Sequence, residues 1–191
     1  DPYNMNPFFG YKGWYHDVIK WYSDLEAKRP LEDFELYSLA RAYSKYAKIT
    51  LSAPYEVFYG LPDDFLTDNK ASAKQIELYS SIENKATYYF HQTYLKNPNW
   101  KTITGNIIIK YSNEVVTQYH TLALHTTHKE ALKVFEGKEL YTKKFLAFII
   151  NMLENCSPNA ILWTYGDNTS LPMFYLQQIK GIRKDVLVSN V

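Results

Sequence analysis

The sequence predicts a mainly α-helical protein: an array of antiparallel helix pairs followed by a small C-terminal βαβ unit. Three observations support this prediction. Apolar residues recur at helical spacing through most of the chain. Short segments rich in proline, glycine and asparagine separate these helical segments. Only the last thirty-odd residues have the pattern strand, turn, helix, strand, which is the spacing of a crossover between parallel strands.

The composition indicates a globular protein. Of the 191 residues, 46% are hydrophobic and 21% are charged. Disordered chains have fewer hydrophobic residues and more charge than this. A net charge of +1 argues against a nucleic-acid or anionic-membrane partner. No apolar run approaches the roughly 18 residues of a membrane span. The single cysteine, Cys156, follows an apolar helical run, so we expect a buried and unreactive thiol.

The first half of the chain predicts three helices, at residues 14–28, 33–49 and 71–96. Pro30 and the acidic residues after it are signals for the start of the second helix. The third helix has a candidate break near Ser80. Between the second and third helices, residues 51–69 hold two prolines and a glycine, which predicts an ordered loop or a short helical turn.

Gly137 marks the boundary at which we divide the chain into two domains. Residues 1–137 are expected to form the helical array, and residues 138–191 a helix and an incomplete α/β unit. The unit is expected to be incomplete because the sequence stops at Val191, just after the second strand has begun. Three further helices are expected, at residues 103–128, 129–136 and 139–155.

The predicted βαβ unit begins with a short apolar strand at 160–165. Gly166 permits a tight turn, Ser170 is expected to cap the following helix, and Gly181 ends that helix. A second strand follows at 186–188.

Polar side chains gather in the turn between the first strand and the helix. The carboxyl ends of strands in α/β units are a common place for ligands. The free amides at the helix start, with Asp167, Asn168, Thr169 and Ser170, could hold a polar group, a sugar hydroxyl or a metal-bound phosphate. The alternative is a turn that only reverses the chain through local hydrogen bonds, since no third acidic residue lies nearby.

Elsewhere the residue types that carry catalysis or bind metals are poorly placed. His125 and His128 lie on one face of a helix, but no further histidine or cysteine follows at a ligand spacing. The acidic pairs at 32–33 and 63–64 adjoin prolines, which is typical of helix starts and turns. No nucleophile motif or phosphate loop is present. The sequence therefore predicts no catalytic residue, no metal and no cofactor.

Two sets of residues follow the spacing of paired repeat helices. With them the chain resembles the tetratricopeptide family over about residues 14–128, with an insertion at 51–69; an unrelated helical bundle is the alternative. The first-helix set is Leu36, Leu39, Ala40 and Tyr43, and the second-helix set is Ala86, Phe90, Thr93 and Pro98. Aromatic residues make up 17% of the chain, and tyrosines can either fill the seams between helices or form a binding surface. The resemblance implies a groove that binds a peptide or a protein. The groove residues that we expect are Tyr37, Tyr43, Tyr89 and Tyr111.

A second resemblance is carried by the run Pro158-Asn-Ala-Ile-Leu-Trp-Thr-Tyr-Gly-Asp-Asn168 and by Gly181-Ile-Arg-Lys-Asp-Val186. Over about residues 141–191 the chain resembles the C-terminal soluble region of Bacteroidetes membrane proteins described as protein O-mannosyltransferase-like. This resemblance implies an extracytoplasmic bacterial location and a link to glycans, but not catalysis by this chain. Thr169 stands where that family has an acidic residue, which weakens a metal or catalytic role for the turn.

Together these observations predict a non-catalytic interaction or scaffold module of a bacterial cell-envelope protein, with a protein or peptide as its partner. The alternative is a soluble part of a glycan-processing or sugar-transferring enzyme, with its ligand at the Gly166–Ser170 turn.

Overall fold

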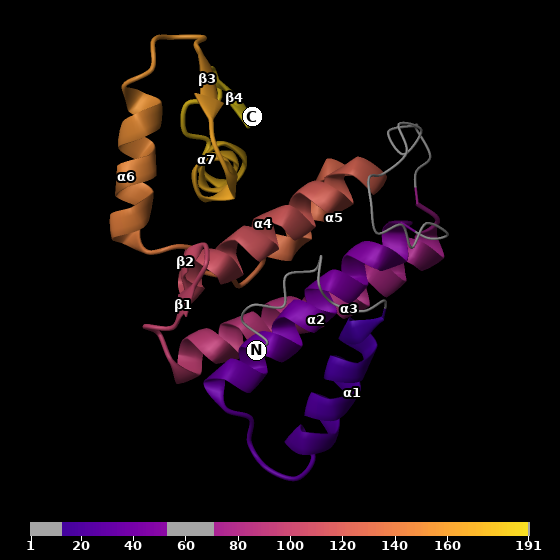
Figure 1. Ribbon diagram of the computed structural model, residues 1–191. Helices are drawn as coiled ribbons and strands as arrows, with labels where there is room; N and C mark the ends of the chain where they lie inside the picture. Colours follow the sequence, from indigo (N-terminus) through magenta and orange to yellow (C-terminus); the bar gives the residue numbers. More distant parts are fainter. Residues whose placement is uncertain (1–12, 53–70, 191) are drawn as a thin grey trace. The chain divides into compact units, whose positions relative to one another are not determined.

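The computed structural model describes residues 13–52 and 71–190 (Figure 1). Most of them are helical, with a few short strands, which confirms the predicted mainly α fold. The backbone groups into two compact units. The first contains the described residues up to Trp100 and residues 124–127, and the second contains residues 101–123 and 128–190. Among the described residues, no helix is long and apolar enough to cross a membrane. The domain boundary at residue 137 stays a prediction, and most of the predicted insertion at 51–69 lies outside the described residues.

The first unit is built on a close pair of helices, α2 and α3, with α1 packed against α2. Its helices are α1 (Trp14–Glu26), α2 (Asp33–Ser52) and α3 (Ala73–Lys96). Ala40 and Ala86 are fully buried, and small residues let helix axes approach closely. The larger Leu39 and Phe90, also fully buried, fill the remaining space. The alternation of small and large residues thus forms the core of this unit.

Helix α3 begins at a capping box and continues without a break. The side chain of Ser72 accepts a hydrogen bond from the Gln75 amide, and the Gln75 side chain accepts one from the Ser72 amide. The predicted break near Ser80 is wrong, because the helix runs through this residue. The buried neighbours Tyr79 and Ile82 hold this turn in the core, so tertiary packing outweighs the modest helix propensity of serine.

The second unit combines helices with two small pairs of strands. Its elements are β1 (Lys101–Thr102), β2 (Gly105–Asn106), all but the last two residues of α4 (Ile107–His125), α5 (His128–Leu132), the 3₁₀ helix η2 (Lys133–Phe135), α6 (Lys143–Glu154), β3 (Ile161–Thr164), α7 (Asp167–Lys180) and β4 (Leu187–Asn190). The expected helix start at 103 is wrong, since β1 and β2 form an antiparallel hairpin there. Gly105 has φ 112°, and the Thr102 hydroxyl donates to its carbonyl at 2.9 Å, which stabilises this turn.

The C-terminal βαβ unit is confirmed. Strands β3 and β4 are parallel, with Ile161 opposite Leu187 and Thr164 opposite Asn190. Helix α7 connects them and packs against β4 and α6. Gly181 ends α7 in the left-handed conformation with φ 69°, as the sequence predicts.

The start of α7 differs from the prediction. Gly166 is the N-cap, with φ 81° and ψ 158°, so the chain passes from β3 directly into a helix that begins at Asp167. Ser170 therefore lies inside the helix, and its hydroxyl donates to the Gly166 carbonyl at 3.0 Å; the prediction that it caps the helix is wrong. Pro172 is also inside the helix, where it has no amide hydrogen to donate to the carbonyl of Asn168. A glycine can turn the chain more tightly than a serine cap allows, because its φ is unrestricted.

Candidate functional site

The four predicted ligand residues lie together at the start of α7, directly after β3. Two of them donate hydrogen bonds within the turn itself. The Thr169 hydroxyl lies 3.0 Å from the Tyr165 carbonyl and 3.1 Å from the Gly166 carbonyl, and the Ser170 hydroxyl also donates to Gly166. Hydroxyls that bond back to the preceding turn are common in helices. The hydroxyl groups of Thr169 and Ser170 therefore already donate to backbone carbonyls of the same turn.

Asn168 is engaged on both ends of its amide. Its Nδ2 donates to the Thr104 carbonyl at 2.6 Å, and its Oδ1 accepts from Nδ2 of Asn113 at 2.8 Å. The Oδ1 of Asn113 in turn accepts from the Tyr141 hydroxyl at 2.9 Å. We call Tyr141, Asn113, Asn168 and Thr104 the Asn168 network. It joins α7 to α4 and to the loop that precedes α6, so Asn168 has a structural role in the second unit.

Tyr141 is the buried end of this network. Its side chain is 7% exposed, its φ is 59°, and its backbone amide donates to the Ser112 hydroxyl at 2.8 Å. Burial raises the pKa of the phenol well above its usual range, and the nearby charges of Tyr175 and Asp167 raise it further. The phenol therefore remains a neutral hydrogen-bond donor at any physiological pH.

Asp167 is the one predicted ligand residue at this turn whose side chain is exposed without a hydrogen-bond partner among the described residues. An acidic residue in the first turn of a helix is stabilised by the helix dipole, so this placement also has a structural reason. Across the described residues, no group of three histidine, cysteine or acidic side chains could hold a metal ion. The contacts at the turn thus favour a structural role for three of its four side chains.

His125 ends α4 and His128 begins α5, so the prediction that they lie on one face of a helix is wrong, and each ring has its own partner. Nδ1 of His125 accepts from the Ala71 amide at 3.2 Å. Nδ1 of His128 lies 3.1 Å from the Tyr119 hydroxyl. Each ring nitrogen named here is used by the protein, which is consistent with a structural role for both rings.

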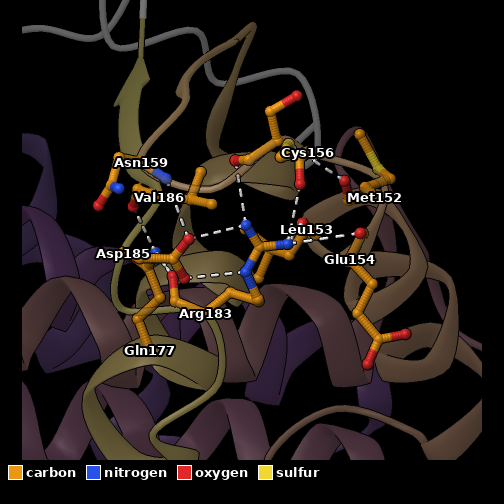
Figure 2. A network of polar contacts seen from close by, with 10 residues as sticks. Met152, Leu153, Glu154, Cys156, Asn159, Gln177, Arg183, Asp185 and Val186 are labelled. Atoms are coloured by element: carbon orange, nitrogen blue, oxygen red, sulfur yellow. Dashed lines mark hydrogen bonds and ion pairs between the residues drawn. The ribbon is translucent and has the colours of Figure 1, made fainter.

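A second polar cluster lies at the other end of the strands and centres on Arg183 (Figure 2). This residue, in the loop between α7 and β4, has φ 46°. Its guanidinium donates to Asp185 through Nε and Nη2, both at 2.8 Å. It also donates to the carbonyl groups that end α6 and lead toward β3: Leu153 at 2.8 Å, Cys156 at 3.1 Å and Ser157 at 3.1 Å. One planar guanidinium thus ties the loops before both strands together.

Asp185 completes this cluster. Its Oδ2 accepts from the Asn159 amide at 3.2 Å, close to the start of β3. The Arg183 guanidinium and, next, the Asn159 amide hold the pKa of the Asp185 carboxyl well below its usual range. Nε2 of Gln177, on α7, donates to the carbonyls of Arg183 and Val186 at 2.9 and 2.7 Å. Cys156 is half-buried here, with its thiol directed at the Met152 carbonyl.

The residues of this cluster fall in the part of the chain that carries the second sequence resemblance. Residues 146–191 match the family described as TMEM260-associated domain 2. The matched segment is about a quarter of the chain and contains β3, α7, β4 and most of α6. The resemblance of the C-terminal segment is thereby supported, whereas the tetratricopeptide resemblance stays a prediction. No curated protein and no solved structure matches the chain.

Within the TMEM260-associated domain 2 segment, the Gly181-to-Val186 motif has a clear structural use. Gly181 ends α7, Arg183 and Asp185 hold the loops, and Val186 is buried with an exposed fraction of 2%. The motif therefore has a structural role in the fold of the segment.

The predicted groove tyrosines lie mostly in the interior. Tyr37 is 3% exposed, with its ring centroid 5.7 Å from that of Phe90. Tyr43 is buried and stacks on Tyr89 with an interplanar angle of 1°. Tyr111 is buried in the second unit. Only Tyr89 is half-buried, so these rings form two cores and do not line one surface.

The first unit has a surface hollow that the sequence analysis missed. Its volume is 430 Å³, and it lies where α1 ends, α2 begins and α3 ends. Tyr88 and Leu95 are 55% and 58% exposed at its wall. The signal in the sequence is the spacing of Tyr88, Gln92 and Leu95 at i, i+4 and i+7, which places them on one helix face. The uncharged lining residues are Pro30, Leu31, Leu36, Tyr88, Gln92 and Leu95.

Two charged residues, Glu26 and Lys96, also line the hollow. Nζ of Lys96 lies 2.9 Å from the Glu32 carboxylate and donates to the Leu31 carbonyl at 2.7 Å. Glu26 accepts a hydrogen bond from the Tyr89 hydroxyl at 2.7 Å. Burial and this hydrogen bond raise the pKa of the Tyr89 phenol. The ammonium group is therefore paired by the protein, whereas Glu26 has no ion-pair partner among the described residues.

The Asn168 network gives a stability prediction. Replacing Tyr141 by Phe removes the hydroxyl and leaves the buried Oδ1 of Asn113 without its donor, so the free energy of unfolding should fall by about 1–3 kcal/mol. Urea unfolding of the full chain, followed by circular dichroism, measures this loss. Tyr165→Phe is the matched control, because Tyr165 is 88% exposed and should change stability by less than about 0.5 kcal/mol. Equal effects of the two substitutions would contradict the role of the network.

The Arg183 cluster gives a pH prediction. Because the folded-state pKa of Asp185 lies below its unfolded value, the pair stabilises the protein above the ordinary carboxyl pKa, and this contribution is lost as the pH falls below it. Asp185→Asn should therefore lower stability near neutral pH and make its decline toward pH 3 shallower. Thermal midpoints between pH 7 and pH 3 measure this, with the exposed Asp24→Asn as control. An unchanged acid slope in Asp185→Asn would show that the cluster does not stabilise the fold.

Proposed function

We propose that this chain is a non-catalytic protein-interaction or scaffold module and that its partner, a protein or peptide, binds the hollow of the first unit. The observation that carries the proposal is the exposure of Tyr88 and Leu95 at the wall of this hollow. Large apolar side chains grouped around a concavity are typical of sites that anchor a partner's side chain. The buried Leu31 and Leu36 supply an apolar floor beneath them.

The cellular setting that we propose is a bacterial cell-envelope protein, with this chain outside the cytoplasm. It rests on the resemblance of residues 141–191 to a region of O-mannosyltransferase-like membrane proteins, and the family match at residues 146–191 supports that resemblance. In such a setting the second unit is a folded attachment that holds its shape through the Arg183 cluster and the Asn168 network.

The alternative function is a soluble part of a glycan-processing or sugar-transferring enzyme. The observation that favours it is the exposed carboxylate of Asp167 at the amino end of α7, the position where an α/β unit presents polar groups to a ligand. The engagement of Asn168, Thr169 and Ser170 by the chain argues against it, because these groups would need new partners to contact a sugar.

The interaction function predicts that short peptides bind the hollow. Peptides selected from a random twelve-residue display library on the immobilised full chain should lose about tenfold or more in affinity toward Leu95→Glu. Fluorescence polarisation with each selected peptide measures the affinity. Leu78→Glu is the matched control, since Leu78 is also exposed on α3 but does not line the hollow. A failure to select any peptide, or equal binding to Leu95→Glu and wild type, would overturn the proposal.

A thermal-shift screen decides the alternative. Nucleotide sugars, simple glycans and divalent metals are added to the wild type and to Asp167→Ala, and we expect no shift in either protein. A ligand present at 100 times its dissociation constant stabilises the folded state by about 2.7 kcal/mol, which such a screen detects. A shift that Asp167→Ala abolishes would establish the turn as a ligand site and favour the enzyme-related function.

A further inference from the structure

The charges around the hollow are unequal, and this inequality restricts what binds there. Lys96 is the cation that lines the hollow, and Arg29 lies three residues after Glu26. The Arg29 guanidinium forms two hydrogen bonds with Glu35, at 2.7 and 2.8 Å, and Lys96 pairs with Glu32. Both cations are therefore neutralised by carboxylates of the same unit.

Glu26 is the carboxylate that lines the hollow and has no ion-pair partner among the described residues. Its only hydrogen bond among the described residues comes from the neutral phenol of Tyr89, which does not cancel its charge. Burial and Glu26 itself raise the pKa of that phenol, so the proton stays on Tyr89 at physiological pH. Among the described residues that line the hollow, Glu26 therefore carries a negative charge without an ion pair, beside an apolar floor.

We infer that the hollow accepts a segment of a partner protein in which a large apolar side chain adjoins a lysine or arginine. The apolar side chain would occupy the space lined by Leu31, Leu36 and Leu95, and the cation would pair with Glu26. This inference rests on the proposed function and adds the chemistry of the partner. The volume of 430 Å³ is in the range of pockets that enclose small ligands, which is enough for one or two large side chains.

Other occupants fit these groups less well. An acidic segment would place its carboxylates against Glu26, and like charges at short range oppose binding. A purely apolar segment would cover the floor but leave the carboxylate of Glu26 next to apolar atoms, where its loss of hydration is costly. A segment that carries both an apolar and a basic side chain compensates both features of the hollow.

The test compares peptides and protein variants in a double-mutant cycle. The peptides selected on the full chain should be enriched in lysine or arginine beside a leucine, phenylalanine or tryptophan. Replacing that cation by methionine should weaken binding to the wild type about threefold to fivefold, as expected for a partly exposed ion pair. Binding to Glu26→Gln should not depend on the replacement, because the carboxylate is absent.

The variants are chosen to keep the fold intact. Glutamine has the shape of glutamate and still accepts the Tyr89 hydrogen bond, so Glu26→Gln should keep the wild-type circular dichroism spectrum. Asp24→Asn is the matched control, an exposed carboxylate on α1 that does not line the hollow, and it should retain the preference for a cation.

The outcomes separate the inference from the proposed function. If no peptide is selected, or if binding ignores Leu95→Glu, the proposed function fails. If peptides bind in a Leu95-dependent way but show no preference for a cation, or show the same preference with Glu26→Gln, the inference is overturned and the proposed function stands. A salt-sensitive preference that disappears with Glu26→Gln and persists with Asp24→Asn would support it.

Discussion

The fold of the C-terminal segment depends on one guanidinium group. Parallel strands cannot be joined by a tight turn, so the loops that lead into β3 and β4 are far apart in the sequence. A side-chain contact is therefore needed to hold these two loops next to each other. Arg183 supplies it by bonding to carbonyls at the end of α6 and to Asp185, which holds the amide of Asn159. A lysine could not reproduce these contacts, because an ammonium group lacks the planar fork that reaches several acceptors at once.

The periodicity of the sequence predicts most of the helices and the βαβ unit, but neither the β1–β2 hairpin nor the polar contacts. Apolar spacing located α1, α2, α3 and the βαβ unit, because burial of one helix face is a local property of the sequence. Arg183 and Asn168 bond to backbone carbonyls as far as 30 and 64 residues away, and no sequence pattern identifies a carbonyl as an acceptor. The start of α7 was misplaced for a related reason, since Gly166 turns the chain without a side-chain signal.

The aromatic residues show the same distinction within the first unit. Tyr37, Tyr43 and Tyr89 are predicted groove residues because tyrosine suits both helix seams and binding surfaces. In the structure Tyr43 and Tyr89 stack on each other, and Tyr88, one residue earlier, is exposed at the hollow. One residue corresponds to about 100° around a helix, so neighbouring tyrosines can belong to the core and to the surface. The composition is compatible with tyrosines in helix seams and on a binding surface, and only the packing shows which ring lies in which place.

The hollow of the first unit and one side of the β3–β4 pair both expose large apolar side chains, and they differ in the partners that they can distinguish. In the second unit, one side of the β3–β4 pair exposes Ile161, Trp163, Tyr165 and Leu187, although parallel strands are usually covered on both sides. None of these four side chains carries a charge, so this side could bury an apolar partner but would not distinguish one apolar partner from another. The hollow of the first unit combines apolar side chains with the carboxylate of Glu26, which has no ion-pair partner among the described residues. Selection between partners requires a group that penalises the wrong one, and of these two surfaces only the hollow has such a group.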